Sequence, residues 1–128
     1  MIDAQTLLAK IGQKVKQLEA ATERYKQALA ESQAKGIEWA GAEALYKKVR
    51  YTAELEHDGP AHERRAAGEV ASVKALEAWR RAEVLYDAAK ESVWIAKHEV
   101  ENARSVLSAV QTASSLIRAE SEFTRHQT

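Results

Sequence analysis

Two long stripes of uncharged residues, each repeating in alternate steps of four and three, constrain this chain more than any other feature. The stripe in the first half contains Ala4, Leu8, Ile11, Val15, Leu18, Thr22, Tyr25, Leu29, Ser32, Gly36 and Trp39. The stripe in the second half contains Ala75, Trp79, Ala82, Tyr86, Ala89, Val93, Ala96, Val100, Ala103, Leu107, Val110, Ser114, Ile117 and Ser121. No member of either stripe is charged, although charged residues make up 30% of the chain. A sustained 3.5-residue repeat is typical of a coiled coil, so we expect two long helices that pack on each other.

The two stripes match each other when the chain folds back about Gly59. This register pairs Leu8 with Val110, Leu18 with Val100, Gly36 with Ala82 and Trp39 with Trp79. Glycine is common just after a helix and proline in the first helical turn, so Asp58, Gly59 and Pro60 form the predicted turn. We therefore predict an all-α fold, a long antiparallel two-helix coiled-coil hairpin. It forms a single domain over residues 1–128, with arm 1 at about 3–56, the turn at about 57–61 and arm 2 at about 62–125.

Lys35-Gly36 is the weakest point of the first arm, because a glycine inside a helix costs about 1 kcal/mol relative to alanine. After it the apolar pattern shifts phase. One interpretation is a continuous helix in which Gly36 permits close approach of the second arm. The alternative is a break into two helices.

A second apolar stripe lies beside the seam at the end of the hairpin that carries both termini. It contains Val106, Ala109, Ala113 and Leu116 in the second arm, with Ile2 and Leu7 in the first. A two-helix hairpin buries only a thin core, so we expect these residues to join copies of the chain into a homodimeric helical bundle.

The overall composition excludes several classes of function. The chain has no cysteine, which excludes disulfides and thiolate metal sites and is compatible with the cytoplasm. The formal net charge is zero, so no general electrostatic attraction to nucleic acid or anionic membrane is expected. The first residues do not resemble a signal peptide, and no apolar run is long enough to cross a membrane.

The residues around the turn contain two candidate sites. His57, Asp58, His62 and Glu63 are metal-ligand types, but they suit helix ends equally well, and we expect no metal, cofactor or catalytic site. Tyr46, Tyr51, Arg64 and Arg65 are the residues best suited to anchor a partner, because tyrosine and arginine dominate binding hot spots. Aromatic and basic residues together also bind single-stranded nucleic acid, which remains an alternative.

Trp39-Ala40-Gly41 matches the W-x-G turn of small helical-hairpin substrates of type VII secretion. In that family the chain bends at this motif, whereas the register here places the bend at Gly59. A secretion-related hairpin, either of this kind or a type III escort coiled coil, is a further alternative.

Two segments carry a resemblance to a known group of proteins: KKVRYTAELEHDGPAHERRAAGEVA at 47–71 and ENARSVLSAVQTASSLIRAE at 101–120. They resemble small bacteriophage helical-hairpin proteins encoded near recombination and replication genes, with Thr112 departing from the usual serine. The resemblance covers about half of the chain and supplies no catalytic residues. It implies a phage accessory factor in the host cytoplasm that binds a protein partner. From the sequence we therefore expect a non-enzymatic interaction or scaffold protein.

Overall fold

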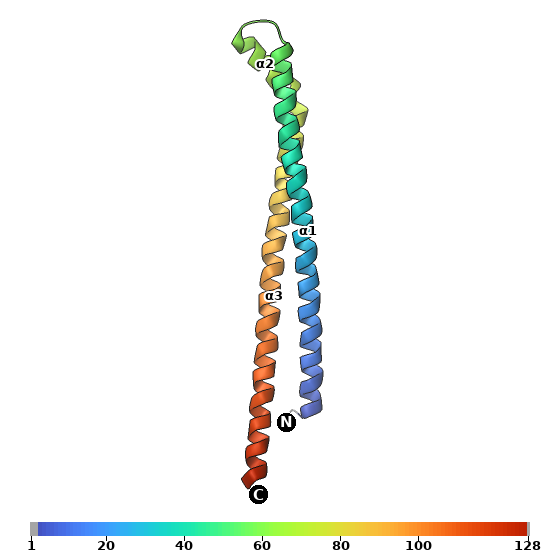
Figure 1. Cartoon of the computed structure of the whole chain (residues 1–128), viewed down its shortest axis with the longest axis vertical. Helices are drawn as coiled ribbons and strands as arrows, with labels where there is room; N and C mark the ends of the chain where they lie inside the picture. Colours follow the sequence, from blue (N-terminus) through green and yellow to red (C-terminus); the bar gives the residue numbers. More distant parts are fainter. Residues whose placement is uncertain (1–2, 128) are drawn as a thin grey trace. The chain divides into compact units, whose positions relative to one another are not determined.

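The computed structural model describes residues 3–127, and within that range the chain is all-helical. It comprises α1 (Ala4–Glu56), α2 (Ala61–Ala71) and α3 (Val73–Gln127), coloured from blue through green to red along the chain in Figure 1. Neither of the long helices contains a proline, and good helix formers dominate both. The predicted all-α class is confirmed.

The first helix begins at a side-chain cap and continues without a break to Glu56. Asp3 accepts a hydrogen bond from the backbone N–H of Thr6 at 2.7 Å, which lowers the pKa of the Asp3 carboxyl below its ordinary value. The helix passes through Lys35-Gly36 in regular conformation, so the alternative of two helices is wrong. The ring of Tyr86 lies against Gly36, where an added Cβ would be 3.2 Å from the ring carbons.

The chain leaves the helical conformation at residues 57–60, between α1 and α2. Gly59 has φ of +144°, a value that strains any residue with a Cβ. Pro60 follows in extended conformation as the N-cap of α2, and Glu63 lies in the first turn of that helix. The reversal is therefore made by Asp58, Gly59 and Pro60.

The second arm is two helices rather than the single one predicted for residues 62–125. At Ser72 the backbone departs from helical values, with φ of −97° and ψ of 4°. The Ser72 hydroxyl donates to the carbonyl of Gly68 at 2.7 Å, the same carbonyl that accepts the Ser72 N–H. A serine hydroxyl that binds the preceding turn in this way bends helices, which explains the correction.

The described chain divides into two compact units. Unit 1 contains α1 up to Gln27 and α3 from Trp94 onward, and unit 2 comprises Ala28–Val93.

In unit 2 the antiparallel packing of α1 and α3 rests on aromatic pairs. The ring centroids of Trp39 and Tyr86 lie 5.8 Å apart, and those of Tyr46 and Trp79 lie 5.2 Å apart. The sequence analysis paired Trp39 with Trp79, whereas in the structure Trp39 packs on Tyr86, seven residues further along α3. The predicted register is therefore wrong by one heptad. A heptad pattern recurs every seven residues and so fixes the phase of packing but not its register. The reversal is not symmetric about Gly59, because α2 and the turn at Ser72 precede α3.

In unit 1 small and branched residues form the buried seam. Ala21, Ala96 and Val100 are buried, and Arg24 pairs with Glu99 at 3.3 Å from α1 to α3. At the start of α1 the predicted positions are exchanged. Leu7 is buried at 6% exposure, whereas Leu8, which was assigned to the seam, is 63% exposed.

Candidate partner-binding surface

A groove between the last turns of α1 and the first turns of α2 brings together three of the four predicted partner-binding residues. It is lined by Tyr51, Glu54, Leu55, Ala61, Arg64 and Arg65. Tyr51 and Leu55 are 64% and 81% exposed. We call these six residues the tip groove. It combines an apolar floor with two guanidinium groups.

The side chains of the two arginines of the tip groove form no hydrogen bond or ion pair with the described residues. The carboxylate of Glu54 is already engaged by Arg50, 3.3 Å away. Lys47 is similarly paired with Glu43 at 2.9 Å, and this contact raises the pKa of Lys47 above its ordinary value. The unpaired charge on the groove is therefore positive.

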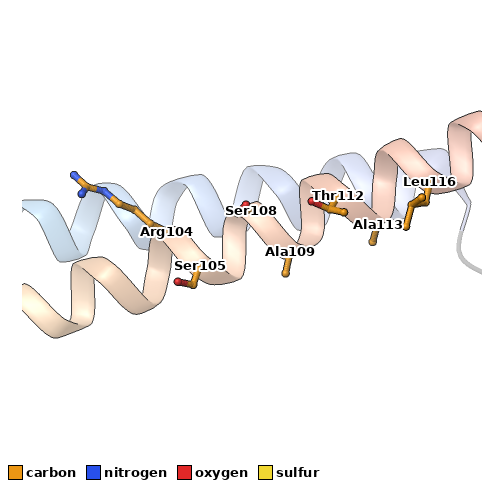
Figure 2. Close-up of a pocket in the computed structure, with 7 residues that line it drawn as sticks. All are labelled: Arg104, Ser105, Ser108, Ala109, Thr112, Ala113 and Leu116. Atoms are coloured by element: carbon orange, nitrogen blue, oxygen red, sulfur yellow. The ribbon is translucent and has the colours of Figure 1, made fainter.

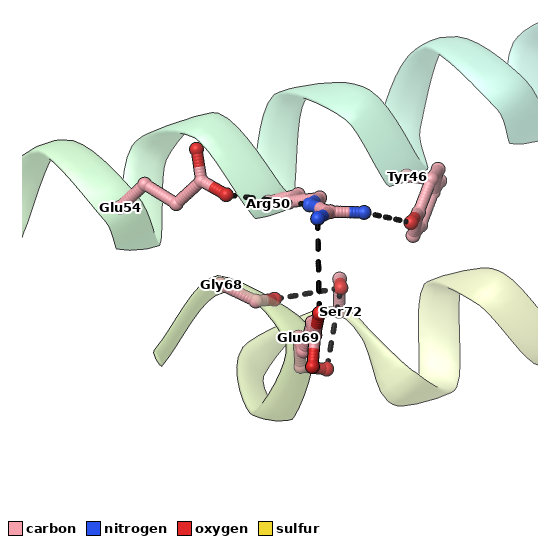
Figure 3. A network of polar contacts seen from close by, with 6 residues as sticks. All are labelled: Tyr46, Arg50, Glu54, Gly68, Glu69 and Ser72. Carbon is pink, nitrogen blue, oxygen red and sulfur yellow. Dashed lines mark hydrogen bonds and ion pairs between the residues drawn. The ribbon is translucent and has the colours of Figure 1, made fainter. Parts of the chain in front are cut away.

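Arg50 ties α2 to α1 behind the groove (Figure 3). Its guanidinium donates to the Tyr46 hydroxyl at 2.8 Å and to Glu54 at 3.3 Å, and it lies 3.9 Å from Glu69 of α2. The hydrogen bonds to Tyr46 and Glu54 raise the pKa of Arg50. Gly68 brings the α2 backbone close to α1, since an added Cβ would lie 2.6 Å from Glu54 Cγ. These contacts hold the two walls of the groove in place.

Tyr46 lies outside the tip groove and lines a neighbouring pocket with Tyr51 and Arg65. It is half-buried, and its ring stacks on Trp79 with the ring planes 24° apart. Its side chain therefore belongs to the core of unit 2, where the heptad register of the structure places it. The sequence pattern missed this because it paired Trp79 with Trp39.

The residues predicted for self-association have mixed environments. Ala109, Ala113 and Leu116 are exposed and line a shallow groove along α3, with Arg104, Ser105, Ser108 and Thr112 (Figure 2). Val106 is half-buried beside this groove. Leu7 is buried in unit 1 and cannot contribute to an outer surface, and Ile2 lies outside the described residues.

Several exposed apolar residues were not singled out from the sequence. Among them are Leu55 in the tip groove and Trp94, which is 62% exposed. The Trp94 ring lies 4.1 Å from that of His98, whose Nδ1 is 3.4 Å from a Glu101 carboxylate oxygen. Neither Leu55 nor Trp94 belongs to the predicted stripes. Their positions outside the heptad pattern could have indicated that they are exposed.

The turn offers no metal centre. His57 and His62 are exposed, and no group of three His, Asp or Glu side chains in residues 3–127 is arranged to hold a metal ion. Over the same residues, no helix combines the length and apolar composition that crossing a membrane requires. Comparison with protein-family models, with curated proteins and with solved structures finds no match to this chain.

Proposed function

We propose that this chain is a non-enzymatic interaction protein that binds a protein partner through the tip groove. The observation that carries the proposal is the exposure of Tyr51 and Leu55 beside two unpaired arginines. Tyrosine and arginine side chains are enriched in binding hot spots, and exposed Leu55 adds apolar surface beside them. A partner segment with an apolar side chain next to acidic residues complements this surface.

The proposal includes a wider arrangement in which α1 and the returning helices form a two-helix coiled-coil hairpin. Two copies then join through residues of unit 1, a set that does not include the residues of the tip groove. Such a dimer is a scaffold that presents two equal binding sites. The resemblance to phage helical hairpins favours an accessory factor that works in the cytoplasm of a bacterial host on a protein of DNA metabolism or host takeover.

Site-specific photo-crosslinking tests the tip groove. A photoreactive amino acid at Tyr51 is expected to capture one protein of the host, identified by mass spectrometry. Arg64→Glu with Arg65→Glu is expected to abolish that capture. The matched control is Arg80→Glu with Arg81→Glu, an exposed arginine pair of α3 outside the groove, which is expected to leave capture unchanged. If the protein without further changes and both double variants captured the partner equally, the groove would be refuted as the binding site.

A second candidate function is binding of single-stranded nucleic acid at the same surface. Lys48, Arg64 and Arg65 have no ion-pair partner among residues 3–127, and Tyr51 supplies an exposed ring for base stacking. The acidic residues Glu56, Asp58 and Glu63 nearby oppose it. A gel shift with single-stranded DNA that weakens steeply with salt, and that is lost in the Arg64 and Arg65 double variant, would favour this function over a protein partner.

A further inference from the structure

A stripe of uncharged residues runs along the outer face of α3 in unit 1, separate from the seam that packs on α1. Its members recur in steps of four and three and are all exposed: Ser105, Ala109, Thr112, Leu116, Ala119 and Phe123. Leu116 and Phe123 are 66% and 64% exposed. We call this set the outer stripe. Water would be in contact with two large apolar side chains here unless another surface covers them.

The outer stripe contains both a groove and the side chains that fit it. Ser105, Ala109 and Thr112 belong to the shallow groove of Figure 2, where small side chains let a helix backbone approach closely. A helix seated there must present large apolar side chains one heptad apart, over Ser105 and Thr112. Leu116 and Phe123 have that spacing. Phe123 can cover Ser105 and Leu116 can cover Thr112 only if the second helix runs in the opposite direction, so the pair is antiparallel.

We propose that the outer stripe binds a second copy of the chain in an antiparallel, two-fold symmetric pair. Phe123 of each copy lies over Ser105 of the other, Leu116 over Thr112, and Ala119 over Ala109. The two-fold axis passes at the level of Ser114. Two kinds of layer result: a large side chain over a small one, and alanine over alanine. All six residues of the stripe take part. This inference rests on the proposed self-association and specifies its residues and direction.

Charge complementarity supports the same direction. Arg104 lies at the edge of the groove, and Glu122 lies eighteen residues further on, or five turns at 3.6 residues per turn, hence on the same flank of α3. Neither forms an ion pair within the described residues. The antiparallel pair brings Arg104 of each copy to Glu122 of the other. A parallel pair would place Phe123 on Phe123 and would put Arg104 of one copy and Glu122 of the other on opposite sides of the interface, where they could not pair.

Cysteine crosslinking tests the direction and register, because the natural chain has no cysteine. Ala109→Cys and Ala119→Cys are small changes at exposed positions that face each other only in the proposed pair. Under mild oxidation a mixture of the two variants is expected to give a disulfide-linked dimer, whereas each variant alone gives little. Efficient dimers from each variant alone would indicate a parallel pair and overturn the inference. A dimer by sedimentation whose mixture does not crosslink would overturn the register and leave self-association standing.

Sedimentation over a range of concentrations tests the residues. The contact spans fewer than three heptads, so a weak, concentration-dependent dimer is expected. Leu116→Ala and Phe123→Ala should each weaken it at least tenfold, while Val84→Ala, exposed to a similar degree but outside the stripe, should not. Arg104→Glu should weaken it, and adding Glu122→Arg should restore it. A natural chain that stays monomeric at all concentrations would overturn both this inference and the proposed self-association, but not partner binding at the tip groove.

Discussion

Replacing Gly68 by alanine tests how closely α2 approaches α1. A Cβ at this position would lie 2.6 Å from Glu54 Cγ and 3.1 Å from the carbonyl oxygen of Arg50. The first distance is about 1 Å shorter than an ordinary contact between carbon atoms. The second involves backbone of α1, which can move only if the helices separate.

Two effects of opposite sign decide the outcome of Gly68→Ala. Alanine is favoured over glycine inside a helix by about 1 kcal/mol. Overpacking a close contact costs about 1–3 kcal/mol. Because both a side-chain carbon and a backbone oxygen are too close, we expect the cost to exceed the gain, with a net loss of roughly 1–2 kcal/mol. For a domain of this size that corresponds to a fall of about 3–8 °C in Tm.

Gly41→Ala is the matched control. Gly41 also lies inside a helix, but an added Cβ there would meet nothing within 4 Å. Only the higher helix propensity of alanine remains, so this variant should be more stable than the natural chain by about 1 kcal/mol. Thermal and urea unfolding followed by far-UV circular dichroism measure both. If Gly68→Ala stabilised the protein as much as Gly41→Ala, the close approach of α2 to α1 would be refuted. Adding Glu54→Ala should reduce the cost of Gly68→Ala, because it removes the Cγ atom.

Three further predictions concern the ends and the core of the helices. Gly59→Ala should lower the free energy of unfolding by about 1–2 kcal/mol, since φ of +144° strains any side chain, and urea unfolding measures this. The pKa of Asp3 is lower in the folded chain than in the unfolded chain. The ionised carboxylate therefore stabilises the fold at any pH above its unfolded-state pKa, and this stabilisation is lost as the pH falls through its folded-state pKa. Asp3→Asn should remove this acid-side loss of helicity, measured by circular dichroism against pH, while keeping a cap. Acrylamide should quench the fluorescence of exposed Trp94 and spare half-buried Trp39 and Trp79, and Trp94→Phe should remove the quenched component.

Much of the fold followed from the sequence because helix propensity and heptad phase are local properties. The seam predicted on the second arm is buried or half-buried in α3 from Ala75 through Ser114. On α1 most of the predicted seam positions from Ile11 to Trp39 are half-buried, whereas Ala4, Leu8 and Leu29 are exposed. Ala21 is buried at 2% exposure where Thr22 was expected, because both neighbours are uncharged and the pattern cannot choose between them.

The failures have a common origin in contacts between distant segments. Trp39 packs on Tyr86, and Trp79 packs on Tyr46 instead of on Trp39. Predicting these pairs requires the alignment of α1 with α3, and a local sequence pattern does not contain that alignment. The break at Ser72 accompanies a hydrogen bond from the Ser72 hydroxyl to the Gly68 carbonyl, and serine occurs in many uninterrupted helices, so the sequence alone did not indicate it. Two of the site residues, Arg64 and Arg65, did line a common groove with Tyr51, because the turn at Gly59 was placed correctly. Leu55 escaped notice because an exposed leucine in a helix is ordinary until the groove beside it is known.

The aromatic pairs of unit 2 have a consequence for how sequences of this kind can diverge. Alanine at every seventh position of α3 fits against α1 equally well after a slip of one heptad, so that column alone does not distinguish between alternative alignments of the helices. Trp39 with Tyr86, and Tyr46 with Trp79, do distinguish between them, because a slip would separate each ring from its partner. We therefore expect the four aromatic positions to change together in evolution, as two matched couples, while the alanines drift one at a time among small residues. A natural variant that lost one ring of a couple would be expected to have a compensating substitution at the other.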